Sequence, residues 1–323
     1  MGIYFFQGYK CLFIVIRRHY MDKLVWTSPT IETLKNFREL PFKGSDTSWV
    51  NIFLLRRKYK LETAVHDGVL FRRYHGKSPN RQGYGFPLSA EKLDTEKVFS
   101  ILRQDAADSD GIKFCLCDEE QKSVLSEHFN IEWDSDPGDC DYIYECEKWH
   151  DFSGKRYSRL RNRANMFERL YPASEYFPID SESRLRDALY VAQVWQEEHK
   201  DKSMPGEELD EELNCIMDAV KYWQELGMIG GVLYVDGSPV AAEMASFLSA
   251  DCVDLHFDKA VSRFAAAGAT VVSRRSFAAS GIVGDRQFFN LEEDMNIPGL
   301  RQSKETYRPA FKLSKYYGGE SSC

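Results

Sequence analysis

The segment Gly230–Leu248, GGVLYVDGSPVAAEMASFL, carries the clearest fold signal in the chain. Two runs of strand-forming residues flank Asp236-Gly237, and an Asp-Gly pair in that position predicts the tight turn of a β-hairpin. Helices and strands alternate around this hairpin. The predicted elements are helices over about Ser183–Glu198 and Glu207–Leu226, a strand over Cys252–Phe257, a helix from Gly268 to about Ser280, and a strand near Gln287–Asn290.

The first half of the chain repeats this plan. Its predicted elements are a helix in Trp49–Tyr59, a hairpin around Asp67-Gly68, a helix over Ser89–Gln104, a strand over Ile112–Cys117, a helix over Glu119–Phe129 and a strand over Asp141–Tyr144. The loop Lys77–Gly85, rich in Pro, Asn and Gly, is expected to be exposed and mobile. Two such units in 323 residues predict an α/β (α+β) fold of two duplicated domains with mixed sheets flanked by helices.

We place the first domain at residues 21–150 and the second, beginning with a basic linking helix, at residues 151–323. Residues 1–20 form an N-terminal extension of uncertain status. They include the apolar run of Tyr9–Tyr20, YKCLFIVIRRHY, which is too short to cross a bilayer. No other segment approaches the length of a transmembrane helix. A lipid partner would therefore be met by peripheral contact with a membrane.

The composition sets further limits on function. The chain has 42 Lys and Arg against 50 Asp and Glu, a net charge of −8, so an anionic partner must meet a local basic patch. Its eight cysteines include no C-x-x-C pair and no zinc-like His spacing, so we predict free thiols, no metal and a cytoplasmic location. The sequence predicts no oligomeric state.

The segment Asn290–Tyr317, NLEEDMNIPGLRQSKETYRPAFKLSKYY, concentrates charged and aromatic residues around a turn. Pro298 fixes φ and Gly299 permits positive φ, so the chain is expected to reverse there. Cations and tyrosines follow, and together they can meet an anionic group by charge and a ring by stacking. The alternative is a closing helix and an edge strand with a solvated basic face.

A second basic segment spans Lys155–Tyr171. Arg156, Arg159 and Arg163 recur at the spacing of one helix face, with apolar residues on the other face. Ser153 suits the N-cap, and free backbone N–H groups beside Lys155 can hold a phosphate. We therefore predict that this face binds tRNA phosphates or another polyanion. The alternative is a solvated helix face bridged to nearby carboxylates.

These two segments resemble a family of mostly uncharacterised bacterial proteins classed with the C-terminal domain of phosphatidylglycerol lysyltransferases. The resemblance rests on a Ser-Gly-Lys helix start followed by Arg-Asn and on a tail motif. The matching positions are Ser153, Gly154, Lys155, Arg161, Asn162, Asn290, Glu292, Asp294, Gly299, Leu300, Arg301, Lys304, Tyr307 and Pro309. The resemblance implies two tandem GNAT-type acyl-CoA N-acyltransferase domains. It also implies an aminoacyltransferase that takes an amino acid from aminoacyl-tRNA to a lipid or a peptidoglycan precursor.

The resemblance also suggests site residues. Lys304 and Tyr307 would contact phosphate or the developing oxyanion. His256, Asp258 and Glu292 are candidates for the base, although a lone His on a strand is often a core residue. The candidate substrate- and phosphate-binding residues are Lys155, Arg156, Arg159, Asn162, Arg163, Glu243, Lys259, Glu292, Asp294 and Arg301. Glu243 would be a buried acceptor-binding carboxylate or an outward-facing side chain, and Lys259 could equally be an ion-pair partner.

The donor is the open question. In GNAT-type folds the loop before a helix cradles the pyrophosphate of coenzyme A, and Phe257–Ser273 would be that place. Its Arg263 and Gly268-Ala269 imitate the usual signature only loosely, which favours aminoacyl-tRNA as donor and no bound cofactor. The alternatives are an acyl-CoA-dependent N-acyltransferase and a noncatalytic protein that binds an anionic ligand. In the leading hypothesis, Arg159 and Lys304 converge on one cleft between the two halves.

Overall fold

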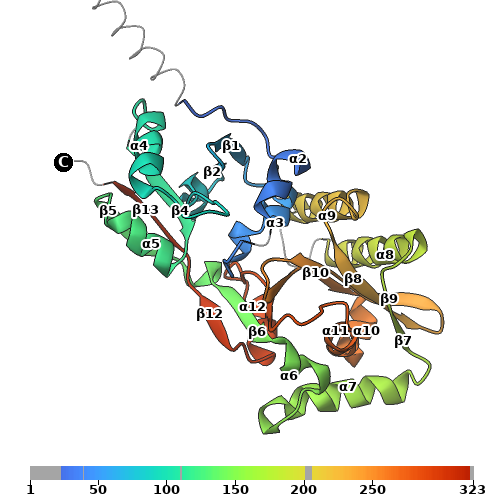
Figure 1. Cartoon of the computed structure of the whole chain (residues 1–323). Helices are drawn as coiled ribbons and strands as arrows, with labels where there is room; N and C mark the ends of the chain where they lie inside the picture. Colours follow the sequence, from blue (N-terminus) through green and yellow to red (C-terminus); the bar gives the residue numbers. More distant parts are fainter. Residues whose placement is uncertain (1–22, 39, 110, 201–205, 321–323) are drawn as a thin grey trace, which may run out of the picture. The chain divides into compact units, whose positions relative to one another are not determined.

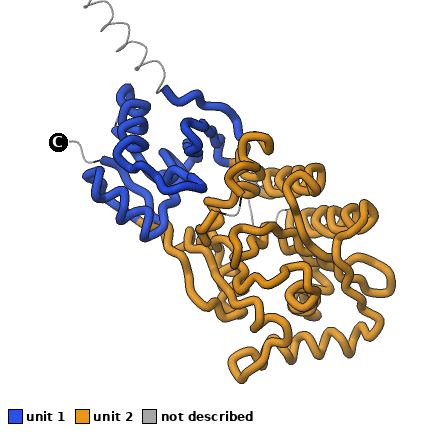
Figure 2. Tube along the Cα trace, viewed as in Figure 1, with its two compact units in different colours: residues 1–29, 59–134, 316–323 blue, residues 30–58, 135–315 orange. Residues whose placement is uncertain are grey.

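A computed structural model describes residues 23–38, 40–109, 111–200 and 206–320 of the chain. The proposed extension at residues 1–20 lies outside them. The chain forms two compact units, each made of separate stretches (Figure 2). Unit 1 holds residues 1–29, 59–134 and 316–323, and unit 2 holds residues 30–58 and 135–315. The division at residue 150 expected from the sequence does not coincide with these units.

Unit 1 contains a six-stranded sheet of order β1-β2-β3-β4-β13-β5 (Figure 1). The strands are β1 (Glu62–His66), β2 (Val69–His75), β3 (Gln82–Tyr84), β4 (Lys113–Cys117), β5 (Ile131–Ser135) and β13 (Tyr316–Glu320). Helices α4 (Thr95–Asp105) and α5 (Glu119–Ser126) belong to the same unit. Phe71, Phe99 and Phe114 are buried in its core.

The segment expected to be an exposed loop in unit 1 is only partly one. Residues 77–79 are exposed, Pro79–Arg81 form a short 3₁₀ helix, and β3 follows at once. Arg81 and Tyr84 are buried, and the Tyr84 hydroxyl donates a hydrogen bond to Asp105 at 2.7 Å. The second half of the predicted loop is therefore a strand, because pairing with β2 and β4 outweighs the turn-forming composition.

Unit 2 contains a seven-stranded mixed sheet of order β12-β6-β11-β10-β9-β8-β7. The strands are β6 (Asp141–Glu145), β7 (Glu175–Pro178), β8 (Ile229–Val235), β9 (Ser238–Phe247), β10 (Cys252–Ala260), β11 (Phe288–Asn290) and β12 (Phe311–Leu313). The helices are α2 (Ile31–Leu34), α3 (Trp49–Leu54), α6 (Cys146–Asp151), α7 (Ser158–Leu170), α8 (Glu182–His199), α9 (Gly206–Lys221), α10 (Ser262–Ala267), α11 (Ala269–Ala279) and α12 (Pro298–Thr306). The hairpin predicted around Asp236-Gly237 is β8–β9.

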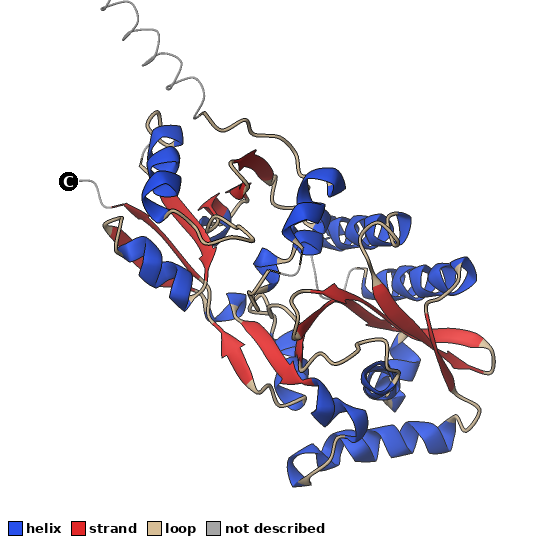
Figure 3. Cartoon of the chain, in the orientation of Figure 1, coloured by secondary structure: helices blue, strands red, loops and turns tan. Residues whose placement is uncertain are grey.

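Helices cover both faces of this second sheet (Figure 3). Helices α8 and α9 lie on one face, and α6, α7, α10 and α11 lie on the other (Figure 1). Trp149 on α6 packs against the rings of Phe289 and Tyr307 at centroid distances of 5.0 and 5.3 Å. Among the described residues, no helix is both long enough and apolar enough to span a bilayer.

The strands β10 and β11 position the candidate site. They pair in parallel from Cys252 to Asp254 on β10, and then the pairing ends. Strand β10 continues alone on that edge while its other edge stays paired with β9, with a bulge between Leu255 and Phe257. The chain after Asn290 therefore turns away from β10, and Glu292 in this loop lies 3.3 Å from His256 on β10.

The predicted fold class, mixed α/β with two mixed sheets flanked by helices, is confirmed. The helix expected in Trp49–Tyr59 is shorter, because α3 ends at Leu54. The strands β5, β7, β12 and β13 escaped prediction from the hydrophobic pattern. Their residues are mostly half-buried or exposed, so apolar alternation does not mark them.

One prediction concerns the close approach of β8 to β9. A Cβ on Gly230 would lie 2.2 Å from the backbone oxygen of Glu243, so we expect Gly230→Ala to force the strands apart and to destabilise unit 2 by about 1–3 kcal/mol. A Cβ on Gly299 in α12 would meet nothing within 4 Å. Gly299→Ala is the control and should raise stability slightly. Urea unfolding of the two variants tests this, and equal stabilities would contradict it.

Candidate functional site

A pocket of about 430 Å³ opens in unit 2 between helices α7, α10, α11 and α12. It joins the basic helix to the tail motif, which the sequence analysis treated as two separate segments. The lining residues are Leu160, Arg163, Ala265, Thr270, Val271, Gly299, Gln302, Ser303, Thr306 and Tyr307. All of them belong to unit 2, so the expectation of a cleft between the two halves of the chain is wrong for this pocket.

A buried polar cluster lies next to the pocket wall formed by Tyr307. The Arg274 guanidinium from α11 lies over the Tyr307 ring at 4.2 Å and forms an ion pair with Asp258 on β10. Asp258 is the cross-strand partner of Glu243 on β9, which is fully buried. The Tyr176 hydroxyl donates a hydrogen bond to the Glu243 carboxyl at 3.3 Å. Cross-strand partners share a face of the sheet, so this cluster lies on the side covered by α11.

Two atoms of this cluster, Asp258 Oδ1 and Arg274 Nη1, have no hydrogen-bond partner among the described residues, whereas Ser273 lies within hydrogen-bonding reach of Glu243. Buried polar atoms are nearly always paired in folded proteins. A concentration of unpaired donors and acceptors behind a pocket is typical of a site that completes its hydrogen bonds with a ligand or with water.

Burial shifts the proton affinities of two groups on this face. Desolvation, followed by the neighbouring Asp258 charge, raises the pKa of Glu243 to about 8. Desolvation also raises the pKa of Tyr307 to about 12, against an opposing effect of Arg274. Tyr307 therefore keeps its proton at neutral pH and can act as a hydrogen-bond donor in the pocket.

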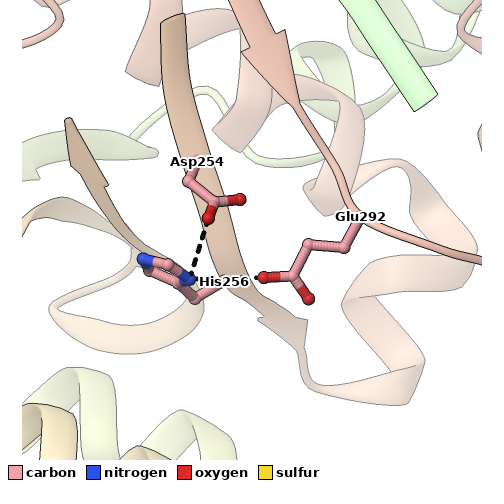
Figure 4. Close-up of side chains that lie close together, drawn as sticks. All are labelled: Asp254, His256 and Glu292. Atoms are coloured by element: carbon pink, nitrogen blue, oxygen red, sulfur yellow. Dashed lines mark hydrogen bonds and ion pairs between the residues drawn. The ribbon is translucent and has the colours of Figure 1, made fainter. Parts of the chain in front are cut away.

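A second cluster surrounds His256 (Figure 4). Its Nδ1 lies 3.3 Å from Glu292 Oε1 and 3.7 Å from Asp254 Oδ2. Its Nε2 lies 2.8 Å from Ser246 Oγ. The side chains of His256 and Asp254 are 1% and 0% exposed, whereas that of Glu292 is 24% exposed. Glu292 is thus the member of this cluster that solvent reaches.

The bulge in β10 separates the two clusters. Asp254 pairs with Ser246 on β9, and the register then shifts so that Phe257 opposes Met244 and Asp258 opposes Glu243. His256 therefore stays with Asp254, while Asp258 points to the opposite face. The sequence predicted both His256 and Asp258 as candidate bases. In the structure their side chains lie on opposite faces of the sheet.

The tail motif holds the loop between β11 and α12. The buried Lys304 ammonium donates to the backbone carbonyls of Leu291, Glu292 and Glu293, the last two at 3.0 and 2.7 Å. Desolvation lowers the pKa of Lys304 to about 8, so the amine still carries its proton at neutral pH. Lys304 faces inward, and the prediction that it contacts a substrate phosphate finds no support in its position.

A second interaction that holds this loop is the ion pair between Asp294 and Arg301. Arg301 donates from Nε and Nη2 to the two carboxylate oxygens of Asp294 at 2.7 and 2.8 Å. The Tyr142 hydroxyl donates to the same carboxylate at 2.6 Å. Although burial opposes it, these bonds hold the pKa of Asp294 below its usual value. Both residues were expected to bind substrate, but their polar groups hold each other.

The predicted basic residues differ in whether they line the pocket. Arg163 lines the pocket and donates to the Ala265 carbonyl at 3.0 Å. Lys155, Arg156, Arg159 and Asn162 are exposed, and Arg156 donates to the Arg308 carbonyl at 3.3 Å. Lys259 pairs with Glu212 at 2.7 Å and lies over the Trp195 ring, away from the pocket. The expectation that Arg159 and Lys304 converge is not met for this pocket: Arg159 is exposed, Lys304 is buried, and neither lines it, whereas Arg163 and Tyr307 do.

Sequence reasoning missed residues that complete both clusters. Arg274 lies within a helix of ordinary composition, and Asp254, Ser246 and Asn51 carry no motif. Asn51 donates to Glu292 Oε1 at 3.1 Å from helix α3, which lies 241 positions earlier in the chain. The one available signal was Asp254, a carboxylate two residues before His256 on a strand whose other members are mostly apolar.

The splayed strands, the glycine-led helix after them and the pocket at its start are the features of a GNAT-type acyltransferase fold. The chain belongs to the family of the phosphatidylglycerol lysyltransferase C-terminal domain, whose model matches residues 37–318. This membership confirms the resemblance inferred from the two motifs and supports the aminoacyl or acyl transferase class. No curated protein matches the chain in sequence.

Solved structures share the architecture. A conserved protein of unknown function from Bacteroides thetaiotaomicron is 24% identical, with a TM-score of 0.83 over 92% of this chain and 100% of that chain. The L-PGS of Bacillus licheniformis is 14% identical, with a TM-score of 0.63 over 92% of this chain and 93% of that chain. FemX is 8% identical, with a TM-score of 0.56 over 91% and 97% of the two chains. At these identities the likeness establishes the fold alone.

The raised pKa of Glu243 predicts a pH dependence of stability. Between the usual carboxyl pKa of 4.5 and the folded value of about 8, the folded state binds more protons than the unfolded state. The free energy of unfolding should therefore fall as pH rises through this window, by up to about 1.4 kcal/mol per pH unit. Glu243→Gln should flatten this fall, and the exposed Glu175→Gln should not. Urea titrations at pH 5, 6.5 and 8 measure it, and matching pH profiles for wild type and Glu243→Gln would refute it.

The position of Lys304 predicts a large loss of stability on truncation of its charge. Lys304→Met leaves three backbone carbonyls without their donor in a buried loop, so we expect a loss on the order of 3 kcal/mol. Lys312→Met is the control, because Lys312 is partly exposed and pairs with Glu305 at the surface. Its loss should stay within about 1 kcal/mol. Thermal and urea unfolding compare the two, and a similar loss for both would show that the carbonyl contacts contribute little.

Proposed function

We propose that this chain transfers an aminoacyl group from aminoacyl-tRNA to an amine or hydroxyl of the lipid-headgroup or peptidoglycan-precursor class. The observation that carries the proposal is the pocket in which Arg163 of the basic helix and Tyr307 of the tail motif face the same space. The family and the name of the Bacillus licheniformis relative agree with this class of reaction. A tRNA donor places the reaction in the cytoplasm, with a lipid acceptor met at the membrane surface.

The proposed donor site combines fixed positive charge with backbone donors. Arg163 lines the pocket, Arg159 lies one turn earlier on α7, and Arg156 lies in the 3₁₀ turn that precedes the helix, and all three are exposed. Phosphates of a tRNA acceptor end can follow this line of guanidinium groups. The opposite wall is the first turn of α11, where Thr270 lines the pocket and the dipole of the helix favours negative charge.

The proposed chemistry uses the reactivity of the donor ester. The acceptor nucleophile attacks the ester carbonyl, a new bond to carbon forms, and the bond to the ribose oxygen breaks. The Tyr307 hydroxyl is suited to donate a hydrogen bond to the oxyanion, since it remains protonated and lies beside Arg274. Glu243 is fully buried and does not line the pocket, so the nucleophile's proton passes to the leaving ribose oxygen rather than to this carboxyl.

An acyl-CoA donor is the second candidate, and one feature favours it. Gly268 has φ +118° at the N-cap of α11, where a side chain on the backbone would be strained. A positive-φ glycine before a helix opens its first N–H groups to a pyrophosphate. Saturable thermal stabilisation by acetyl-CoA, without any by tRNA, would favour this candidate.

The donor site predicts a charge-reversal effect confined to the pocket. Arg163→Glu should weaken binding of aminoacyl-tRNA at least about tenfold and make the salt dependence shallower by about one phosphate contact. Arg169→Glu makes the same change at an exposed position of the same helix and should have a smaller effect. Filter binding at several salt concentrations measures both. Equal losses for the two variants would mean that only general charge matters.

The oxyanion role predicts a selective loss of turnover in Tyr307→Phe. The variant keeps the ring that packs on Trp149 and Arg274 and removes only the hydroxyl, so its melting temperature should change little. We expect the rate of label transfer from a pool of radiolabelled aminoacyl-tRNAs into cell extract to fall about 100-fold. Unchanged transfer by the variant would exclude this role for Tyr307. Binding of tRNA by wild type without any transfer would indicate a noncatalytic protein.

A further inference from the structure

The cluster around His256 lies on the face of the β9–β10 hairpin opposite the proposed transfer pocket, and that reaction leaves it unused. We propose that Asp254 Oδ2, His256 Nδ1 and Glu292 Oε1 bind a divalent transition-metal ion, with Zn²⁺ the best match. These three atoms all lie within 4.8 Å of one another. They offer one imidazole nitrogen and two carboxylate oxygens, a ligand set that zinc accepts.

The spacing fits shared coordination, although the His256–Glu292 separation taken alone is also that of a hydrogen bond. Two ligands bound to one ion at about 2.1 Å, with a tetrahedral angle between them, stand about 3.4 Å apart. His256 Nδ1 lies 3.3 Å from Glu292 Oε1 and 3.7 Å from Asp254 Oδ2. The second separation is too long for a hydrogen bond. Figure 4 shows the two carboxylates approaching the same ring nitrogen, Asp254 from strand β10 and Glu292 from the loop that follows β11.

Asp254 supplies the independent observation. Its side chain is fully buried, and within the described part of the chain neither carboxylate oxygen has a hydrogen-bond partner. A buried carboxylate without a donor or a cation is costly. Glu292 Oε1 already accepts from Asn51, so a metal ion between the two side chains would give Asp254 its partner and would offset the negative charge of the carboxylates.

The neighbouring acidic cluster provides a comparison. Asp46, Asp141 and Glu293 also group their carboxylates in unit 2, but the Lys315 ammonium lies among them at 2.5, 2.6 and 2.9 Å. That cluster has a cation from the chain itself. Among the described residues no Lys or Arg lies within ion-pair distance of Asp254 or Glu292, although the Lys315 charge acts on Asp254 from the neighbouring cluster, so a metal ion would supply a direct cationic contact.

The groups around His256 fix the tautomer and the orientation of its imidazole for metal binding. His256 Nε2 lies 2.8 Å from Ser246 Oγ, and donation of its proton to that oxygen leaves the Nδ1 lone pair facing the two carboxylates. Asn51 donates to Glu292 Oε1 at 3.1 Å and Glu292 N–H donates to Asn290 Oδ1 at 2.6 Å, which fixes the carboxylate. Three protein ligands leave a fourth position for water, and Glu292 is partly exposed.

The test uses the full chain after dialysis against chelator. Isothermal titration with Zn²⁺ should show one tight site per chain, and Mg²⁺ should not compete at equal concentration. Co²⁺ should give the d–d bands of a site with nitrogen and oxygen ligands. Since the chain has eight cysteines, a thiolate charge-transfer band from the tight site would overturn the assignment, as would the absence of stoichiometric binding.

Variants locate the site. Asp254→Asn and His256→Ala should each lower the affinity for Zn²⁺ at least 100-fold, and Ser246→Ala should lower it about 10- to 100-fold through the imidazole. Glu305→Gln, at a surface carboxylate paired with Lys312, is the control and should bind as wild type does. If a buried variant does not fold, the partly exposed Glu292→Gln takes its place. Retention of the tight site in folded Asp254→Asn or Glu292→Gln would refute the proposal.

Discussion

The site of unit 2 depends on one buried ammonium group. Lys304 on α12 holds the carbonyls of Leu291, Glu292 and Glu293, so the chain that leaves β11 cannot follow β10 any further. Glu292 adopts φ +57° in this loop, a conformation that a non-glycine residue keeps only where its surroundings impose it. The hydrogen bonds from Lys304 therefore separate β11 from β10 and also orient the Glu292 carboxylate toward His256.

The β-bulge in β10 then places His256 and Asp258 on opposite faces of the sheet. With regular alternation Asp258 would lie on the same face as His256, and both would share one environment. The inserted residue sends Asp258 toward Arg274 and the pocket, and it leaves His256 beside Asp254. One short strand thus supports two chemically distinct centres, one with a buried cation from α11 and one rich in carboxylates.

The sequence predicted the fold well where local patterns decide it, and the site only in part. The hairpin at Asp236-Gly237 and most central helices and strands follow from periodicity and turn chemistry. The tail motif was recognised, but the side chains of Lys304 and Asp294 turn inward to hold a loop, and the partly exposed Arg301 pairs with Asp294. Spacing alone cannot distinguish a cation that binds a substrate from one that binds carbonyls. Arg274 and Asn51 join the clusters only through long-range packing, which leaves no local signal.

The strand β13 has a consequence for how the protein is made. Tyr316–Glu320 pairs with β4 inside the sheet of unit 1, although it follows the whole of unit 2 in the chain. During synthesis, the ribosome must therefore deliver all of unit 2 before the sheet of unit 1 can be completed. Until β13 is synthesised, the earlier strands of unit 1 have an unpaired edge, and such an edge can pair with another molecule. Chaperone demand should accordingly concentrate on the portion that emerges first.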